Sequence, residues 1–550
     1  MAKKVDTYIG ATSLRTCLGN LAQTTEAMRC GECGLRYNDS YAMYVGAVDV
    51  ELIDGFSRFE SLMIEQISKV LAQTTISLRD EDVQLIVSST KGNVELLATD
   101  ESVPERAFIY SSAEAVAAYF GAANRPIVIS NACISGVSAF VVAKRLIESG
   151  KCKHAIVVGA DVLSEFITSG FASFKSISAS PCRPYDAERD GLTLGEAAGA
   201  LLLTSERDYA DAALVRVAGG AITNDANHIS GPSRTGDGLY YAISGAMSEA
   251  GVGVGDIGFV NTHGTATRFN DEMESKAVAW AELCDVPLNS LKGYIGHTLG
   301  AAGVVETILC VEQMREKRIF GTKGFVASDT PHELKVSSLS QEIDNRCCVK
   351  TASGFGGCNA AIVLDGDDRE VDVQTSHRES RVAAEYALPH SEHPFAEYIR
   401  AEFKKFGESN MKFYKMSDMS KALYVAVEHL LAIEGISDAE PTRRAIVLAN
   451  RAASLDADLI HQQILNKHLP EGASPAAFVY TLANVAAGEM CIRHKIQGEN
   501  TFFIENEESG FVEEYAHNII RGDRADAVIC GWCDYLQGEW NINIKLLKVK

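Results

Sequence analysis

The cysteine at position 133 has surroundings that suit nucleophilic chemistry. Cys133 follows an apolar run at residues 126–130 and precedes the helical pattern of residues 134–149. The positive end of a helix and its unpaired backbone N–H groups favour a thiolate, so we expect a lowered pKa. The neighbouring Ala132 and Ser135 are small and leave room for a thioester. On this local pattern alone, a buried structural cysteine is an equally good interpretation.

Two histidines lie in glycine-rich loops farther along the chain. His263 follows an apolar strand pattern and precedes Gly264, and His297 follows Gly296. Either histidine alone would more often be structural. Together with a thiol at a helix start, they form a Cys-His-His set that is suited to nucleophilic and acid–base catalysis.

The elements that must position these side chains are strands alternating with helices. Apolar runs at residues 84–88, 126–130 and 155–159 predict strands, and residues 134–149 predict an amphipathic helix between the last two. Strand, helix and strand in this order indicate a parallel sheet that is buried on both faces. The sequence therefore predicts an α/β fold.

Several ordered segments carry a family resemblance. They are Leu18-Gly19-Asn20; Asn131 to Gly136; Cys182 to Asp186 with Arg189, Gly191 and Leu194-Gly195-Glu196; His263 to Thr267 with Asn270, Asp271 and Glu274; Lys292 with Gly296 to Gly303 and Glu306; and Gly354 to Ala360. These segments resemble the elongating β-ketoacyl-acyl carrier protein synthases of the thiolase fold. The resemblance covers nearly all of residues 1 to about 366, and six motifs in order make it specific.

The resemblance implies a layered α-β-α-β-α fold of two related halves and a decarboxylative Claisen condensation. Cys133 would hold the acyl chain as a thioester. His263 and His297 would stabilise the enolate that forms when malonyl-acyl carrier protein loses its carboxylate. The product would be a 3-oxoacyl-acyl carrier protein, and neither a cofactor nor a metal is expected.

The resemblance also implies supporting roles. The backbone amides of Cys133 and Phe355 would form an oxyanion hole, and Phe355 would gate the acyl pocket between flexible glycines. Lys292 would hold the histidine loop by pairing with Glu306. Asn359 would support the loop that carries Phe355.

Two departures from the family pattern affect these expectations. Cys358 stands where the family usually has another small residue, and we interpret it as a packed residue, not as a thiolase-type base. The loops around residues 92–125 are short, which leaves the shape of the acyl pocket open.

The chain predicts a second, related domain. We expect a synthase-like domain at residues 1–366, a polar linker at 367–409 and a degenerate half-synthase domain at 410–550. Glu507 stands in the second copy where Cys133 stands in the first. The second copy should therefore be inactive and serve as a built-in partner, unless it is a decaying duplication or a second chain joined to the first.

Composition limits the classes of partner. The formal net charge is -22, which argues against nucleic-acid binding. The sequence shows no signal peptide and no apolar run that could span a bilayer, so we expect a cytoplasmic protein. The fourteen cysteines should be free thiols. We expect an acidic acyl carrier protein as partner, and a homodimer or an internal pseudo-dimer through the C-terminal domain.

Other functions remain open from the sequence. A non-catalytic chain-length factor is one alternative, although Cys133 and both histidines argue against it. A thiolase-type acyltransferase is another, although it would lack the paired histidines. The pathway could be fatty acid synthesis or a specialised route to aryl polyene or flexirubin-like pigments.

Overall fold

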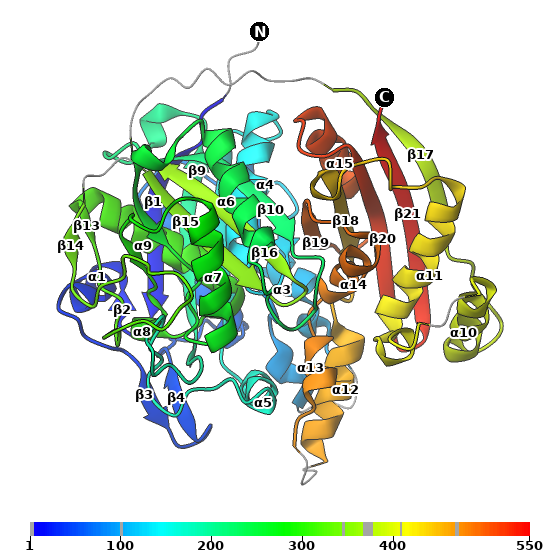
Figure 1. The fold of residues 1–550 in the computed structure, drawn as a ribbon, viewed down its shortest axis with the longest axis horizontal. Helices are drawn as coiled ribbons and strands as arrows, with labels where there is room; N and C mark the ends of the chain where they lie inside the picture. Colours follow the sequence, from blue (N-terminus) through cyan, green and yellow to red (C-terminus); the bar gives the residue numbers. More distant parts are fainter. Residues whose placement is uncertain (1–4, 99–102, 344–346, 367–377, 408–409, 468–471) are drawn as a thin grey trace.

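The computed structural model describes residues 5–98, 103–343, 347–366, 378–407, 410–467 and 472–550. Most of its strands form one long sheet, shown in Figure 1, and the rest form two small sheets. In spatial order the main strands are β12 (Leu288–Asn289), β11 (Ile257–Asn261), β15 (Cys347–Gly354), β16 (Cys358–Asp365), β10 (Arg216–Asn224), β1 (Tyr8–Thr16), β9 (Ala197–Thr204), β7 (His154–Asp161), β5 (Val83–Ser88), β6 (Ile127–Ile129), β19 (Asn500–Ile504), β18 (Arg444–Asn450), β20 (Ala527–Leu536), β21 (Glu539–Val549) and β17 (Ser380–Ala387).

The sheet contains one five-strand arrangement three times. In the first unit, β6, β5 and β7 are parallel neighbours, and β9 and β1 continue antiparallel. The second unit repeats this pattern with β12, β11, β15, β16 and β10. The third unit repeats it with β19, β18, β20, β21 and β17. The region from β1 to β16 therefore consists of two related halves, as the layered fold requires, and a third unit extends it.

The third unit begins within the range that the sequence predicted to be a linker. Residues 367–377 and 408–409 lie outside the described residues, but β17 and α10 (Phe395–Lys405) fall between them. The linker prediction is therefore wrong for β17, which pairs with β21 at the edge of the sheet. The segment is polar because an edge strand exposes much of its surface, which hides the strand pattern in the sequence.

Two buried helices form a layer at the centre of the first two units. α4 (Ser135–Glu148) follows β6, and α9 (Ala302–Glu316) follows the loop of His297. They approach closely where Gly136 faces Gly303: a Cβ on Gly136 would lie 2.6 Å from the backbone nitrogen of Val304. This contact fixes the start of α4 beside the start of α9.

The remaining helices cover the sheet and the ends of its strands. They include α2 (Arg58–Leu71), α3 (Ile109–Phe120), α5 (Glu165–Ser173), α6 (Asp237–Ala250), α7 (Arg268–Trp280), α8 (Lys292–Ile295), α11 (Asp418–Ile433), α12 (Leu455–Asn466), α13 (Pro475–Val479), α14 (Val485–His494) and α15 (Phe511–Arg521). Within the described ranges, no helix has both the length and the apolar character needed to cross a membrane.

The first and third units meet where β6 pairs with β19. Val128 lies opposite Ile504, and Ile129 lies opposite Phe503, in an antiparallel ladder. In Figure 1 the third unit continues the sheet on the right of this seam, from β19 to β17. The seam is short, and Cys133 follows it by only a few residues.

Candidate active site

Cys133 lies in a tight turn between β6 and α4. Ala132 precedes it with a φ of 48°, a left-handed conformation that costs energy for a residue with a side chain. The backbone N–H of Asn131 donates to the hydroxyl of Ser135 at 2.8 Å, and the amide of Asn131 donates to the carbonyl of Asn500 at 2.8 Å. The turn is therefore held from both sides and presents the thiol at the start of α4.

His297 contacts Cys133 directly. Its Nε2 lies 3.1 Å from the Sγ of Cys133. The backbone of His297 is clamped from both sides: its N–H donates to the carbonyl of Thr193 at 2.7 Å, and its carbonyl accepts from Gly195 at 3.0 Å. Gly195 must be glycine here, since a Cβ would lie 2.1 Å from the carbonyl oxygen of Ile295.

His263 completes the group of side chains. Its ring centroid lies 5.0 Å from that of His297, at an angle of 88°. Ligand atoms of Cys133, His263 and His297 all lie within 4.8 Å of one another. The carboxylate of Glu274 holds the His263 loop by accepting from the backbone N–H groups of His263 at 2.8 Å and Gly264 at 2.6 Å. The predicted Cys-His-His set is thus brought together.

A buried cationic cluster lies behind the histidines. Lys292 donates to one oxygen of Glu306 and Lys350 to the other, each at 2.6 Å. The pairing of Lys292 with Glu306 was expected from the sequence, but the role of Lys350 was missed. Its signal was a lone lysine in the otherwise uncharged strand β15.

This cluster sets the protonation of the site. Burial and the nearby charges of Lys292 and Lys350 hold the pKa of His263 and of His297 well below its ordinary value. Burial alone would raise the pKa of Glu306, but the two ammonium groups hold it below its usual range. Both imidazoles are therefore neutral at pH 7, and either can accept a proton.

The expected lowering of the thiol pKa is wrong. Burial raises the pKa of Cys133 to about 12, and the charge of Lys292 offsets only part of this effect. The charge of Asp161 raises this pKa further, and a hydrogen bond to the backbone of Cys133 lowers it only in part. The resting group is a thiol, so reaction requires a base, and His297 is in contact with it.

The loop that carries Phe355 lies against the turn of Cys133. A Cβ on Gly354 would be 3.1 Å from the backbone nitrogen of Cys133. Phe355 is partly exposed, and Gly356 and Gly357 follow it with φ values of 90° and 70°. Asn359 ties the end of the loop, accepting from Ser353 at 2.7 Å. The loop with the expected gate residue Phe355 therefore packs against the turn that carries the thiol.

Cys358 is fully buried next to this loop. Its thiol donates to the carbonyl of Phe355 at 3.2 Å, and burial raises its pKa well above the ordinary value. These contacts are those of a packed residue that holds the loop.

The third unit contributes contacts that sequence reasoning did not find. Asn484, just before α14, donates its amide to the carbonyl of Phe355 at 2.8 Å. Lys91 is buried and donates to Asp458 at 2.7 Å, to Ser454 at 3.1 Å and to the carbonyl of Thr481. No local sequence pattern indicates these contacts, because the partners are separated by more than 100 residues.

The fold and this site define a thiolase-fold synthase with a Cys-His-His centre. Residues 56–209 match the protein family described as "Beta-ketoacyl synthase, N-terminal domain". Residues 214–325 match the family described as "Beta-ketoacyl synthase, C-terminal domain". A protein of Streptomyces halstedii described as polyketide beta-ketoacyl synthase 1 is 32% identical over 282 residues, which are 48% of this chain and 67% of that protein. The chain belongs to the β-ketoacyl synthase family, as the sequence motifs predicted.

Other relatives support the same assignment. The 3-oxoacyl-acyl-carrier-protein synthase 2 of Mycobacterium tuberculosis is 35% identical over 248 residues, which are 42% of this chain and 59% of that protein. The chain also spans 59% of a mitochondrial relative from Schizosaccharomyces pombe. It thus aligns with less than two thirds of these two curated relatives.

Solved structures confirm the predicted fold class. A ketosynthase in complex with its chain length factor from Xenorhabdus doucetiae has a TM-score of 0.59 and 26% identity, over 66% of this chain and 98% of that one. A keto synthase–chain length factor named PfaC has a TM-score of 0.79 and 14% identity, over 99% of this chain and 78% of that one. The second likeness concerns the fold alone, and it includes the third unit.

Proposed function

We propose that this chain condenses an acyl primer with malonyl-acyl carrier protein to give a 3-oxoacyl-acyl carrier protein. The observation that carries the proposal is the 3.1 Å contact between the Cys133 thiol and His297, with His263 beside them. A neutral imidazole in contact with a high-pKa thiol is an arrangement for nucleophilic catalysis by an activated cysteine.

The first step transfers the acyl group to Cys133. His297 accepts the thiol proton as the sulfur attacks the carbonyl carbon of the acyl thioester. The carrier thiolate leaves and takes the proton from His297, so charge and protons balance. The backbone N–H groups of Cys133 and Phe355 stabilise the tetrahedral oxyanion between these events.

The second step forms the new carbon–carbon bond. The malonyl thioester loses its carboxylate as carbon dioxide, and the electron pair moves to the thioester carbonyl as an enolate. Hydrogen bonds from His263 and His297 stabilise that negative charge, and the nearby Lys292 and Lys350 add favourable potential. The enolate carbon then attacks the acyl thioester and expels the Cys133 thiolate, which takes up a proton from water by way of His297. One proton is thus consumed for each carboxylate that leaves as carbon dioxide.

A single-turnover assay tests the reaction. The full chain is mixed with acyl-loaded carrier protein, digested and analysed by mass spectrometry, and malonyl-loaded carrier protein is then added. We expect the acyl mass on the Cys133 peptide alone, followed by its loss and formation of the 3-oxo product. Acyl on Cys358 or Glu507, or condensation without any acylated Cys133, would overturn the proposal.

The alternatives predict different outcomes in the same assay. A chain-length factor that lacks catalysis would not be acylated at all. A thiolase-type acyltransferase would use an acetyl thioester as the second substrate, whereas a decarboxylating synthase requires the malonyl group. Labelled carbon dioxide from carboxyl-labelled malonate therefore separates the two enzyme classes.

We further propose that the third unit is an inactive built-in partner whose surface helps to wall the acyl pocket. Phe478 of this unit supports the idea: its ring centroid lies 5.4 Å from that of Phe171 and 6.2 Å from that of Phe174. Phe355 packs on the same two rings, at 6.1 Å and 5.3 Å. An acyl chain that passes the gate would enter this aromatic cluster.

The length of the product chains tests whether the third unit helps to wall the acyl pocket. Phe478→Ala removes a ring from the cluster, so we expect products at least one two-carbon unit longer, measured by mass spectrometry of the released chains. Phe120→Ala, at the end of α3 outside the aromatic cluster, is the matched control and should leave the length unchanged. Unchanged product length in Phe478→Ala would refute the wall.

The most detailed part of this proposal concerns the acyl substrate and the pathway. Aryl polyene or flexirubin-like synthesis would favour polyunsaturated primers, whereas fatty acid synthesis would favour saturated ones. A panel of carrier-bound primers of varied length and unsaturation separates these routes through the ratio of kcat/KM values.

A further inference from the structure

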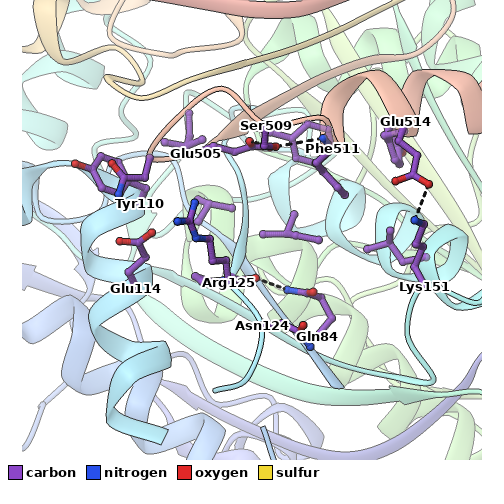
Figure 2. Close-up of a pocket in the computed structure, with 18 of the residues that line it drawn as sticks. Gln84, Tyr110, Glu114, Asn124, Arg125, Lys151, Glu505, Ser509, Phe511 and Glu514 are labelled. Carbon is purple, nitrogen blue, oxygen red and sulfur yellow. Dashed lines mark hydrogen bonds and ion pairs between the residues drawn. The ribbon is translucent and has the colours of Figure 1, made fainter. Parts of the chain in front are cut away.

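A cavity of about 430 Å³ lies beside the β6–β19 ladder, on the seam between the first and third units. Figure 2 shows its lining, with α3 on one side and α15 on the other. Its volume is in the range of small-molecule sites. It belongs to neither histidine loop, and the proposed reaction does not use it.

The base of the cavity is apolar. Val128 and Ile504, which face each other in the β6–β19 ladder, line it together with Phe503. Aromatic rings of α15 continue this surface: the Phe503 centroid lies 5.1 Å from Phe511 and 5.3 Å from Tyr515. This surface suits an aliphatic or aromatic body, and its ring faces attract cations.

The rim carries more carboxylates than cations. Its charged residues are Glu114, Glu505, Glu507, Glu514, Arg125 and Lys151. Lys151 pairs with Glu514 at 2.6 Å, and Arg125 pairs with Glu507 at 2.7 Å. Figure 2 shows the Lys151–Glu514 pair at one end of the cavity and Glu114 at the other. Two carboxylates are thus left over.

Of these two carboxylates, Glu505 gives the stronger indication of a cation-binding position. It is half-buried, and Ser509 donates to it at 2.5 Å. Among the residues that the structure describes, no cation lies within ion-pair distance of Glu505 or Glu114. Burial raises the pKa of Glu505, and the hydrogen bond from Ser509 and the more distant charge of Arg125 offset only part of this effect. A ligand with a positive charge at this position would relieve that cost.

We propose that this cavity binds a small organic cation, namely a protonated amine with an apolar body. The ammonium group lies at Glu505, with Glu114 adding attraction, and the apolar body covers the surface of Val128, Ile504 and Phe503. Arg125 acts as a competitor, since its exposed side chain spans to Glu507 across the rim. The site stands apart from the condensation reaction and does not depend on it.

The test uses the full chain and octylammonium as the probe. A diazirine-bearing octylammonium is irradiated with the protein, and the labelled peptides are mapped by mass spectrometry. We expect labels on residues 125–128 and 503–515, which excess octylammonium abolishes and octanoate or octanol does not. Calorimetry should show at least tenfold weaker binding for Glu505→Gln, and tighter binding for Arg125→Ala. Glu539→Gln, on the exposed start of β21, is the matched control and should bind as the natural chain does.

Three outcomes would overturn the proposal. Labels that appear only elsewhere, or not at all, mean that the cavity does not take the amine. Equal competition by octanol means that the site recognises the apolar body alone. Unchanged affinity in both Glu505→Gln and Glu114→Gln means that these carboxylates do not bind the ammonium group. None of these outcomes bears on acylation of Cys133, so the two proposals fail separately.

Discussion

The turn of Cys133 and the turn of Glu507 follow equivalent strands of two different five-strand units, β6 of the first and β19 of the third. Cys133 lies between β6 and α4, and Glu507 lies between β19 and α15. The first turn faces His263 and His297, which the second unit supplies. The second turn faces no such loops among the described residues, and Glu507 is 66% exposed. A strand-turn-helix frame therefore supplies a reactive position only when a second unit closes over it.

Loss of the Cys133 thiol should have the largest effect on activity. Cys133→Ala removes the acyl carrier, so the rate of condensation should fall by at least about 10³-fold, measured as product formation under saturating substrates. Cys358→Ala is the control, and it should retain acylation because that thiol is packed under the Phe355 loop.

A cysteine placed on the turn of the third unit tests whether the turn alone makes a thiol reactive. Glu507→Cys places a thiol on the equivalent turn, and we expect no acyl mass on that peptide, since no imidazole of the described residues contacts Glu507. Acylation of the new cysteine at a rate near that of Cys133 would show that the frame alone suffices.

The cationic cluster offers a pH-dependent test. Lys350 and Lys292 help to hold the histidine pKa values low, so log kcat should stay level as the pH falls through 6.5. Lys350→Met removes one charge, which raises those pKa values, and the acid limb should move to higher pH. Lys350→Arg keeps the charge and serves as the control. An acid limb that moves equally in both variants would assign the effect to packing.

Asn484 of the third unit, which holds the Phe355 loop, should have a moderate effect on the acylation rate. Asn484→Ala removes the hydrogen bond to the carbonyl of Phe355, which is worth about 1 kcal/mol, so acylation should slow by about fivefold. Asn484→Asp keeps the shape but replaces the donor with a carboxylate. If Asn484→Ala changes KM for the primer but not the acylation rate, Asn484 binds the primer and does not position the loop.

Two of the ion pairs that cross the seam should differ in how much they contribute to stability. Lys91 and Asp458 are 3% and 6% exposed, so Lys91→Met should lower the free energy of unfolding by about 3–5 kcal/mol, measured with urea. Lys91→Met with Asp458→Leu should recover much of this loss, because no buried charge is left unpaired. Arg125→Ala, in the exposed pair with Glu507, should leave the unfolding midpoint unchanged.

The sequence predicted the residues that share a local motif and missed those that meet only in three dimensions. Cys133, His263 and His297 each stand in a recognisable loop, and all three meet in the structure. Lys350, Asn484 and Lys91 act through partners far along the chain. The thiol pKa was predicted with the wrong sign, because burial depends on neighbours that the local sequence does not name.

The same contrast holds for the fold. Buried strands such as β5 and β7 were predicted from clear apolar runs, and the correspondence between the turn of Glu507 and the turn of Cys133 was visible. The edge strand β17 was not, since its exposed surface is polar and its pairing with β21 spans more than 150 residues. The linker boundary was therefore placed too far toward the C-terminus.

The antiparallel ladder between β6 and β19 joins two parts of one polypeptide. Dilution cannot separate strands that share a chain, because their effective concentration is set by the intervening residues and not by the amount of protein. The ratio of the first unit to the third unit is thus permanently one to one, and no exchange of partners can alter it. β19 is also synthesised after β6, so the turn of Cys133 gains this neighbouring strand only once residue 504 has been made.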